Sequence, residues 1–353
     1  MSLVQLRGMP DTSGPVLRDR IARDVRYLRV SLTDRCNMRC TYCMPPEGID
    51  HVPRSEVLSL EEVVRVVERF VAWGVERVRL TGGEPTLRRD LIWLIEQLSA
   101  LELPGRDPGA RLEVVMTTNG ERLEQLAEPL RAAGLGTLTV SVDSLERERF
   151  ATITRRDRLD RVVAGIDAAH AAGLRLKLNT VAVRGFNEDE LARICEFAWA
   201  REATPRFIEL MPMAGGRLYV PGELLPAVAI RERIAADLGA ELEVCEQPKG
   251  PLGPAVYTQL RGGVHEGRRF GTIAAMTENF CGSCNRLRIS ATGQLHACLA
   301  RDDAGDLRGA LRSGDPERLE RVVRLALGHK RDAHGFEIDG RGGPDKAMIS
   351  IGG

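Results

Sequence analysis

The 353-residue chain has no net charge, because 50 lysines and arginines balance 50 aspartates and glutamates. Charge therefore gives no support to a nucleic-acid or membrane-surface partner, and we expect neither. No apolar run approaches the length of a membrane span, and the N-terminal segment lacks the hydrophobic core of a secretory signal. Eight cysteines without such a signal indicate reduced thiols or metal ligands rather than disulfides. These absences predict a cytoplasmic metalloprotein.

Six of the eight cysteines form two sets of three, and each set lacks a nearby fourth cysteine. The first set is Cys36, Cys40 and Cys43, and the second is Cys281, Cys284 and Cys298. An iron–sulfur cubane normally takes one cysteine per iron, so three cysteines leave one iron open for a small molecule. The alternative is a structural zinc site, completed by His51 in the first set or by His296 in the second. We favour two clusters, and interpret Cys195 and Cys245 as structural thiols.

Strand-like and helix-like segments alternate between residues 25 and 213. The expected strands are Val25–Thr33, Arg77–Thr81, Leu112–Thr118, Leu138–Val142, Leu174–Val183 and Arg206–Met211. The expected helices are Leu60–Trp73 after an N-cap at Ser59, Asp90–Leu98, Leu123–Ala132, Leu159–Ala172 and Asp189–Ala200. Six alternations predict an α/β fold with a parallel sheet, but they are too few to close an eight-stranded barrel. We therefore expect an incomplete (βα)6 barrel whose functional residues lie at the carboxyl ends of its strands.

The alternation stops after Met213. A helix is expected near Val228–Leu238, and the segment Gly250–Gly271 is expected to be irregular because it is rich in glycine and proline. We predict three parts: a flexible N-terminal tail over residues 1–24, the part-barrel over residues 25–213, and a C-terminal region over residues 214–353. The last part carries the second cysteine set and is expected to close the open side of the barrel.

Several motifs resemble those of a known superfamily. The CxxxCxxC spacing of the first set, with an aromatic residue before its last cysteine, is the signature of the radical S-adenosylmethionine superfamily. The Gly-Gly-Glu-Pro segment at 82–85 resembles that superfamily's loop for the methionine amino group, where glycine lets the backbone approach a ligand. Within the superfamily, the chain from about Tyr27 to Gly353 closely resembles the GTP 3′,8-cyclases of molybdenum cofactor biosynthesis. The segments that carry this resemblance are Tyr27–Cys36, Thr81–Pro85, Phe280–Arg288 and the terminal Gly352-Gly353.

The resemblance implies a role for each set of matched residues. The first cysteine set would hold a [4Fe–4S] cluster that chelates S-adenosylmethionine, which Tyr42, Gly83, Ser141 and Met211 would contact. The second set would hold another [4Fe–4S] cluster, whose open iron would bind the guanine of GTP. The nucleotide would be surrounded by Arg29, Arg79, Thr117, Lys177, Arg206, Arg286, Leu287 and Arg288. A triphosphate that leaves water needs several cations, so a basic pocket inside a neutral protein fits this expectation.

The resemblance also implies a reaction. Reductive cleavage of S-adenosylmethionine would give a 5′-deoxyadenosyl radical that takes the C3′ hydrogen of GTP. The carbon radical would then attack guanine C8 and lead to 3′,8-cyclo-7,8-dihydro-GTP, in the first step of molybdopterin biosynthesis. The residues expected to act in catalysis are Arg286, Arg288, Gly352 and Gly353.

The implied partners are an unidentified electron donor, a downstream cyclic pyranopterin synthase and a second copy of the chain in a homodimer. Two other functions remain open. One is a radical enzyme that modifies a peptide, since such enzymes also combine a CxxxCxxC motif with later cysteines. The other is a non-catalytic zinc-binding protein.

Overall fold

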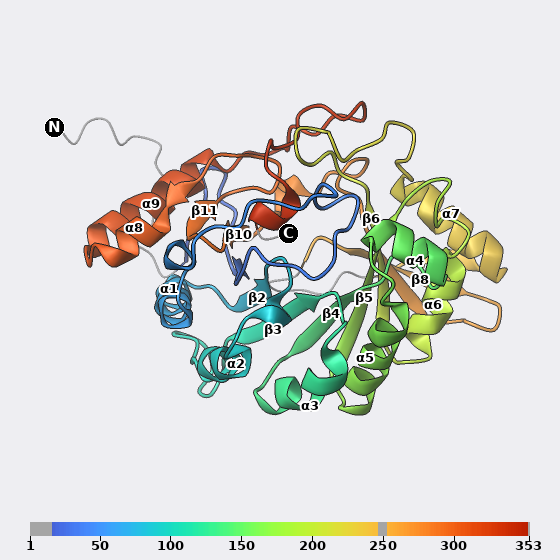
Figure 1. Cartoon of the computed structure of the whole chain (residues 1–353), viewed down its shortest axis with the longest axis horizontal. Coiled ribbons are helices and arrows are strands. Elements are labelled where there is room, and N and C mark those ends of the chain that lie inside the picture. The colour runs from blue at the N-terminus through green and yellow to red at the C-terminus, as the bar shows by residue number, and fades with distance from the viewer. Residues whose placement is uncertain (1–15, 246–252, 352–353) are drawn as a thin grey trace.

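The computed structural model describes residues 16–245 and 253–351, and a twelve-stranded sheet runs through this part of the chain (Figure 1). The strands are β1 (Tyr27–Ser31), β2 (Arg77–Thr81), β3 (Glu113–Thr118), β4 (Thr137–Ser141), β5 (Arg175–Ala182), β6 (Thr204–Glu209), β7 (Glu241–Val244), β8 (Val256–Arg261), β9 (Arg269–Ile273), β10 (Arg286–Ile289), β11 (Gln294–His296) and β12 (Gly305–Asp306). The α-helices are α1 (Leu60–Ala72), α2 (Leu91–Ser99), α3 (Leu123–Ala132), α4 (Arg147–Thr154), α5 (Leu159–Ala171), α6 (Leu191–Trp199), α7 (Ala227–Leu238), α8 (Leu307–Arg312) and α9 (Pro316–His329). Within the described ranges, none of the helices combines the length and the apolar character needed to cross a membrane.

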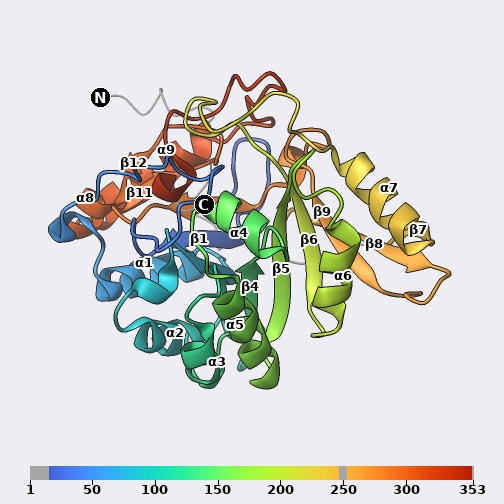
Figure 2. The ribbon, with the colours of Figure 1, turned by 45° about the vertical axis from the view of Figure 1, so that its right-hand side comes forward.

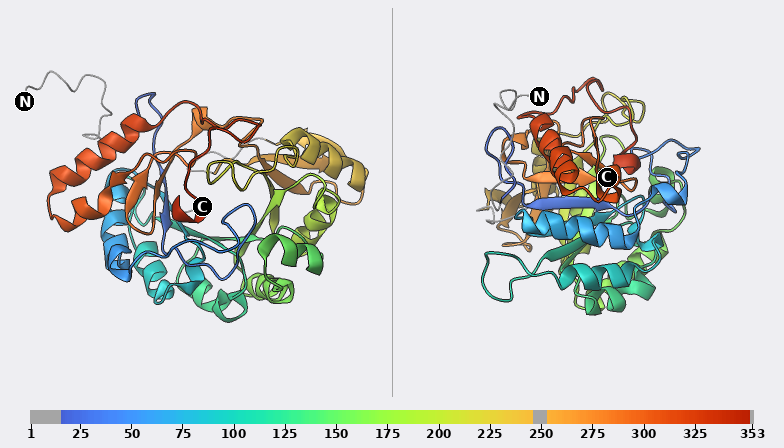
Figure 3. Two further views of the ribbon diagram at one scale, coloured as in Figure 1. Left: turned by 45° about the horizontal axis from the view of Figure 1, so that its top comes forward. Right: turned by 90° about the vertical axis from the view of Figure 1, so that its left-hand side faces the viewer.

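Strands β1 to β6 are parallel neighbours and form the curved centre of the sheet. Helices α1, α2, α3, α5 and α6 connect successive strands and lie along the outer side of the curve (Figure 3). The prediction of an incomplete (βα)6 barrel is therefore confirmed. Among the helices between β1 and β6, α4 was not predicted, because its sequence RERFATIT has few apolar residues at helical spacing. Helices α8 and α9 near the carboxyl end were not predicted either.

Local sequence explains where the first covering helix begins. The Ser59 hydroxyl accepts a hydrogen bond from the Glu62 N–H at 3.1 Å, and the Glu62 carboxylate accepts one from the Ser59 N–H at 2.8 Å. This reciprocal pair satisfies backbone donors that the start of a helix leaves without partners. Val63, Val67 and Phe70 then follow at helical spacing and are buried in the core, so the predicted N-cap at Ser59 is confirmed.

Residues after 213 extend both edges of the six-stranded centre. On one edge β10 pairs with β1 in parallel, and on the other β9 pairs with β6 in parallel (Figure 2). The full strand order is β12-β11-β10-β1-β2-β3-β4-β5-β6-β9-β8-β7. The division at residues 213 and 214 stays a prediction, but hydrogen bonds of a single sheet connect the two parts.

The expectation that Gly250–Gly271 is irregular is wrong for most of its described part, which begins at residue 253. Strand β8 and the start of β9 lie there and pair antiparallel with each other. Glycine and proline dominated the composition of the segment and obscured a short alternating run, Val-Tyr-Thr-Gln-Leu-Arg, in which Thr258 and Leu260 are buried. A run of this kind is typical of a strand.

The predicted flexible tail is also wrong for residues 16–24, whereas residues 1–15 lie outside the described ranges. The Leu17 side chain is fully buried, and its backbone N–H donates to the Trp73 carbonyl at 3.0 Å. Arg23 forms an ion pair with Asp19 and donates to the backbone carbonyls of Cys281 and Arg331. The N-terminal segment is thus attached to the region of the second cysteine set.

The central strands present an apolar face to the covering helices. Leu28 and Val30 of β1, and Val78 and Leu80 of β2, are buried in the main core cluster. Because side chains alternate along a strand, the residues between them point to the inner side of the curve. The predicted polar site residues of these strands occupy that inner side.

Candidate active site

A row of three arginines crosses the inner face of the sheet. In the parallel register of β10, β1 and β2, Arg29 lies opposite Arg288 on one side and Arg79 on the other. Residues paired across neighbouring strands point to the same face, so the three guanidinium groups share the inner side. Burial lowers the pKa of Arg29 well below its usual value, and the charge of Arg288 lowers it further. Burial and the charge of Arg286 likewise lower the pKa of Arg288 to about 10. Like charges packed together out of water indicate a site for an anion.

Threonine hydroxyls hold the side chains of Arg79 and Arg206 in place. Arg79 Nη1 donates to Thr117 Oγ1 at 2.9 Å and to Thr139 Oγ1 at 3.1 Å. The same Thr139 hydroxyl accepts a hydrogen bond from Arg206 Nη2 at 3.0 Å. Arg79 lies on β2 and Arg206 on β6, so a single hydroxyl brings together cations from distant strands. The Arg206 Nε is buried without a hydrogen-bond partner, which leaves a donor for a ligand.

Lys177 completes the cationic surface from the middle of β5. Its Nζ donates to the Tyr257 hydroxyl at 3.4 Å. Burial, followed by the charges of Arg206 and Arg79, lowers the pKa of Lys177 to about 7. In the part of the chain that the structure describes, no carboxylate hydrogen-bonds to the side chain of Arg79, Lys177 or Arg206. The cations are therefore neutralised poorly by the protein itself, as expected of a site that takes a highly charged anion.

The first cysteine set lies in the loop that follows β1. The Arg39 N–H donates to the Thr154 carbonyl and the Thr41 N–H to the Ile153 carbonyl, each at 2.9 Å. Both carbonyls belong to the last turn of α4, where a helix leaves its carbonyls unpaired. The helix that the sequence pattern did not predict thus supports the cysteine loop.

The three thiols of this loop lie close enough for their charges to affect one another. Burial raises the pKa of Cys43 to about 12, and the negative charge of Cys36 contributes. Burial raises the pKa of Cys36 to about 11, and the pKa of Cys40 is raised by burial, by Asp143 and by the other two thiolates. Thiolates gathered in this way require a positive centre, which iron supplies in a cluster.

The predicted adenosylmethionine residues lie at or near the carboxyl ends of strands around this loop. Ser141 ends β4, and Met211 follows β6. The Tyr42 hydroxyl donates to Asp143 Oδ2 at 2.8 Å, two residues beyond Ser141. Burial raises the pKa of Asp143 to about 6, while the hydrogen bonds from Val181 and Tyr42 oppose this shift. The contact fixes the orientation of Tyr42 within the cysteine loop.

Close approach of other atoms explains the glycine at position 83. A β-carbon there would contact the Arg35 carbonyl and would lie 2.7 Å from Ile349 Cδ1. The next residue, Glu84, accepts hydrogen bonds from the Thr118 hydroxyl and from the Asn119 N–H, each at 2.7 Å. This buried carboxylate ties the turn after β2 to the end of β3. The Gly-Gly-Glu-Pro segment is therefore held rigidly beside the first cysteine set.

The last described residues lie in the space inside the curve. The short 3₁₀ helix η5 (Met348–Ile351) lies within the arc of the sheet (Figures 1 and 3). Ile349 and Ile351 are buried, and the Ile349 backbone lies within hydrogen-bonding reach of the Cys43 thiol. The predicted catalytic residues Gly352 and Gly353 lie outside the described residues, directly after this helix.

The second cysteine set has a different electrostatic environment. Burial raises the pKa of Cys281, and the negative charge of Cys298 contributes. Burial also acts to raise the pKa of Cys284, but the charges of Arg286 and Lys330 outweigh it and lower that pKa to about 6. Cys284 Sγ accepts two hydrogen bonds from these cations, one from Lys330 Nζ at 3.3 Å and one from Arg286 Nη2 at 3.6 Å. Cations supplied by the protein therefore stabilise a thiolate at this set.

One predicted nucleotide residue needs correction. The Leu287 side chain is fully buried in the core cluster, on the opposite face of β10 from its two arginine neighbours. Only its backbone is available to a ligand on the inner side. Alternation along the strand, which suggested that Arg286 and Arg288 share a face, also places Leu287 on the other face.

Sequence reasoning missed Thr139, Tyr257 and Lys330. Thr139 lies in the mainly apolar strand β4 and belongs to no recognisable motif. Tyr257 belongs to β8, a segment that was expected to be irregular. Lys330 follows α9 in a segment without a motif. For the first two, the strand alternation of the local sequence was the available signal.

The zinc alternative finds no support in the arrangement of side chains. Within residues 16–245 and 253–351, no group of three or more His, Cys, Asp or Glu side chains is arranged to hold a single metal ion. His51 contacts Asp34 instead, at 3.3 Å. His296 is buried, which lowers its pKa to about 4, and its Nδ1 has no hydrogen-bond partner. A cubane differs from a single-ion site in that each thiolate binds a different iron, so it does not need three thiols to close on one ion.

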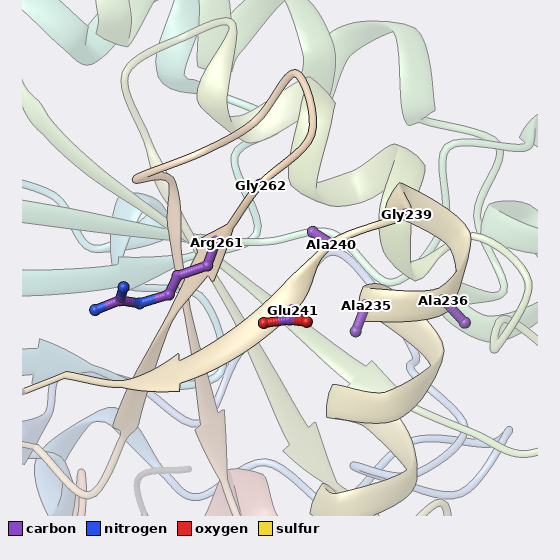
Figure 4. Close-up of a pocket in the computed structure, with 7 residues that line it drawn as sticks. All are labelled: Ala235, Ala236, Gly239, Ala240, Glu241, Arg261 and Gly262. Carbon is purple, nitrogen blue, oxygen red and sulfur yellow. The ribbon is translucent and has the colours of Figure 1, made fainter.

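A separate surface pocket lies outside the curve, where α7 and β7 meet the turn after β8 (Figure 4). Its lining residues are Ala235, Ala236, Gly239, Ala240, Glu241, Arg261 and Gly262. None of them belongs to the predicted site, and Arg261 forms an ion pair with Glu243. The inner face of the sheet therefore remains the candidate active site.

Comparison with known proteins agrees with this geometry. Residues 30–198 match the Radical SAM superfamily, and residues 203–336 match Molybdenum Cofactor Synthesis C. A GTP 3′,8-cyclase of Pseudomonas putida is 42% identical over 327 residues, which cover 92% of this chain and 94% of that protein. The GTP 3′,8-cyclase of Pseudomonas syringae pv. syringae is 43% identical over 331 residues, covering 93% of this chain and 96% of that protein. The chain belongs to the GTP 3′,8-cyclase family.

Structural comparison bears on the fold of this GTP 3′,8-cyclase family member. Streptococcus suis SuiB bound to precursor peptide SuiA aligns with a TM-score of 0.50 at 15% identity, over 64% of this chain and 47% of that chain. A likeness at this identity shows a shared radical SAM fold only. The full-length similarity to GTP 3′,8-cyclases therefore outweighs the peptide-modifying alternative.

Proposed function

We propose that this chain cyclises GTP between C3′ and C8 on the inner face of its part-barrel. The observation that carries the proposal is the joint placement of two three-thiol sets and a surface of buried cations on one side of the sheet. A radical source alone requires only the first set. The second set and the cations next to it suit an anionic substrate that also reaches a metal cluster.

Each cysteine set suits a [4Fe–4S] cluster. The thiols of each set affect one another's pKa, so they lie close together, and neither set forms a site for a single ion in the described residues. Cys36, Cys40 and Cys43 would hold the first cluster, and Cys281, Cys284 and Cys298 the second. When bound, the first cluster supplies the electron that cleaves S-adenosylmethionine and so provides the radical that takes the C3′ hydrogen.

The residues of the chain bind and orient the two small molecules. Tyr42 in the cysteine loop, Gly83 in the turn after β2, Ser141 at the end of β4 and Met211 after β6 would contact S-adenosylmethionine. The side chains that would surround GTP are Arg29, Arg79, Thr117, Lys177, Arg206, Arg286 and Arg288. Because Thr117 and Thr139 already orient Arg79, and Thr139 orients Arg206, little reorganisation is needed to bind phosphate oxygens.

The remaining expectations concern the surroundings of the enzyme. Radical formation requires an electron donor, and the cyclised nucleotide would pass to a cyclic pyranopterin synthase. We further propose a cytoplasmic location, which suits oxygen-sensitive clusters, and a homodimeric state.

Product analysis tests the function directly. Purified protein is incubated anaerobically with GTP, S-adenosylmethionine and a chemical reductant, and the products are analysed by mass spectrometry. We expect 5′-deoxyadenosine together with a cyclised nucleotide that has the mass of GTP. Formation of 5′-deoxyadenosine without a GTP-derived product would leave only the superfamily assignment. Zinc in place of iron would contradict the enzyme function altogether.

The affinity for GTP should fall as pH rises above 7. In the free protein the pKa of Lys177 is about 7, and a bound phosphate would raise it, so binding above pH 7 takes up a proton. The dissociation constant should then rise by up to about tenfold per pH unit, the slope of one coupled proton. Titration calorimetry from pH 7 to 9 measures this dependence, above the range in which the terminal phosphate itself titrates, at about pH 6.

The matched control for this prediction is Lys177→Arg, whose guanidinium stays protonated throughout the range. The variant should bind GTP with little dependence on pH. An equal slope in both proteins would show that another group titrates.

A further inference from the structure

Lys330 is a buried lysine that makes three contacts at the second cysteine set. It follows the last residue of α9, and its side chain is almost completely buried. Its Nζ donates to Cys284 Sγ at 3.3 Å, to the Arg286 carbonyl at 2.8 Å and to the Ala297 carbonyl at 3.2 Å. An ammonium group has three N–H donors, so the three acceptors use all of them.

These acceptors belong to the two segments that carry the cysteines. Cys284 and Arg286 follow the short turn with Cys281, and Ala297 directly precedes Cys298. Lys330 therefore connects both segments from the end of α9, and Arg23 supports the same end of the helix through the Arg331 carbonyl. A lysine buried in this way is rare unless its charge is compensated, and here a thiol and two carbonyls surround it.

The first cysteine set has no comparable lysine or arginine contact. The hydrogen bond to Cys36 Sγ comes from the backbone N–H of Met38, at 3.4 Å. In the described ranges, no lysine or arginine side chain donates to a sulfur of that set, although Arg39 donates to the Cys36 carbonyl. Net charge and hydrogen bonds to sulfur are among the features that set the reduction potential of an iron–sulfur cluster. The two sets should therefore hold clusters of different potential.

We propose that Lys330 is a positioning residue of the second cysteine set, which holds its two segments together and raises the reduction potential of the cluster bound there. The proposal rests on the proposed function only in that Cys281, Cys284 and Cys298 bind a cluster. A positive charge beside a thiolate ligand stabilises the reduced cluster, which carries one more negative charge, over the oxidised one. Lys330 donates to the proposed cluster ligand Cys284, so its effect on the reaction is indirect.

A redox titration of the loaded enzyme tests the proposal. Lys330→Met keeps the approximate shape of the side chain and removes the charge and the donors. The potentials of both clusters are followed by electron paramagnetic resonance, with S-adenosylmethionine and GTP added separately to assign the two signals. We expect the equilibrium constant for reduction of the second cluster to fall at least tenfold, which is about 59 mV for one electron, with the first cluster unchanged.

The neighbouring exposed residue provides the matched control. Arg331→Met removes the same charge from an exposed position at the same end of α9, and should leave both potentials unchanged. Lys330→Arg keeps the charge and should recover most of the potential. An unchanged second-cluster potential in Lys330→Met, or an equal shift in Arg331→Met, would overturn the proposal.

Iron analysis separates this proposal from the proposed function. A wild-type protein with about four irons or fewer, rather than about eight, would contradict the second cluster itself. If the wild-type protein carries both clusters but the Lys330→Met variant does not, the redox titration is carried out on Lys330→Gln instead of Lys330→Met. A lower potential or a lost second cluster in the glutamine variant, with normal behaviour of Lys330→Arg, supports the role of the charge. Loss of the cluster in Lys330→Arg as well would show that side-chain shape is decisive and would overturn the electrostatic role.

Discussion

Replacing Cys40 by alanine should abolish the cleavage of S-adenosylmethionine. Cys40 is the middle thiol of the loop after β1, where burial, Asp143 and both other thiolates raise its pKa. With only two thiolates left, the loop cannot hold a cubane and leave a single iron open. The rate of 5′-deoxyadenosine formation should drop at least about 10³-fold, which corresponds to about 4 kcal/mol of activation free energy. Anaerobic assay with quantification of 5′-deoxyadenosine measures the loss.

Two variants serve as controls for the loss in Cys40→Ala. Cys245→Ser changes a half-buried thiol outside both sets and should retain the activity. Cys281→Ala should lose the cyclised nucleotide but retain some 5′-deoxyadenosine formation, because the first set remains intact. Substantial 5′-deoxyadenosine formation by Cys40→Ala would show that the first set does not bind the catalytic cluster.

Deleting Gly352 and Gly353 should abolish turnover while both clusters remain. The residues just before them, Ile349 and Ile351, are buried inside the curve, and Ile349 lies beside Gly83 and the Cys43 thiol. The described chain therefore stops inside the curve at Ile351, and we expect the two glycines that follow to act there, because glycine can approach a ligand without a side chain. We expect kcat/KM for GTP to fall at least about 10²-fold, equivalent to about 2.7 kcal/mol, at an unchanged iron content.

The double substitution Gly352→Ala with Gly353→Ala keeps the length of the chain and adds two methyl groups. If the absence of side chains matters, this variant should lose most of the activity as well. If only length matters, it should behave like wild type. Full activity of the deletion variant would show that the two glycines take no part in the reaction.

Strong local patterns made much of the fold predictable. The capping box at Ser59 and Glu62, the alternation of apolar residues and the spacing of the strands depend on neighbours in sequence. These are features that the sequence displays directly. Helix α4 was missed because its local pattern is weak and tertiary contacts, the hydrogen bonds from the cysteine loop, stabilise it. Strand β8 was missed because the surrounding glycine and proline residues obscured its short alternating run.

The cysteine sets and the arginine pair on β10 could be recognised from spacing, but their surroundings could not. Chemical type and spacing within a few residues are local properties, so the amino-acid order indicated which cysteines are candidate metal ligands, and the family resemblance indicated the class of reaction. The alignment of Arg288, Arg29 and Arg79 in one row arises from strand register between segments far apart in the chain. The same holds for Thr139 between two arginines and for Lys330 at the second set. These contacts became visible only in the folded chain, because burial and electrostatic interaction depend on distance in space rather than on distance along the chain.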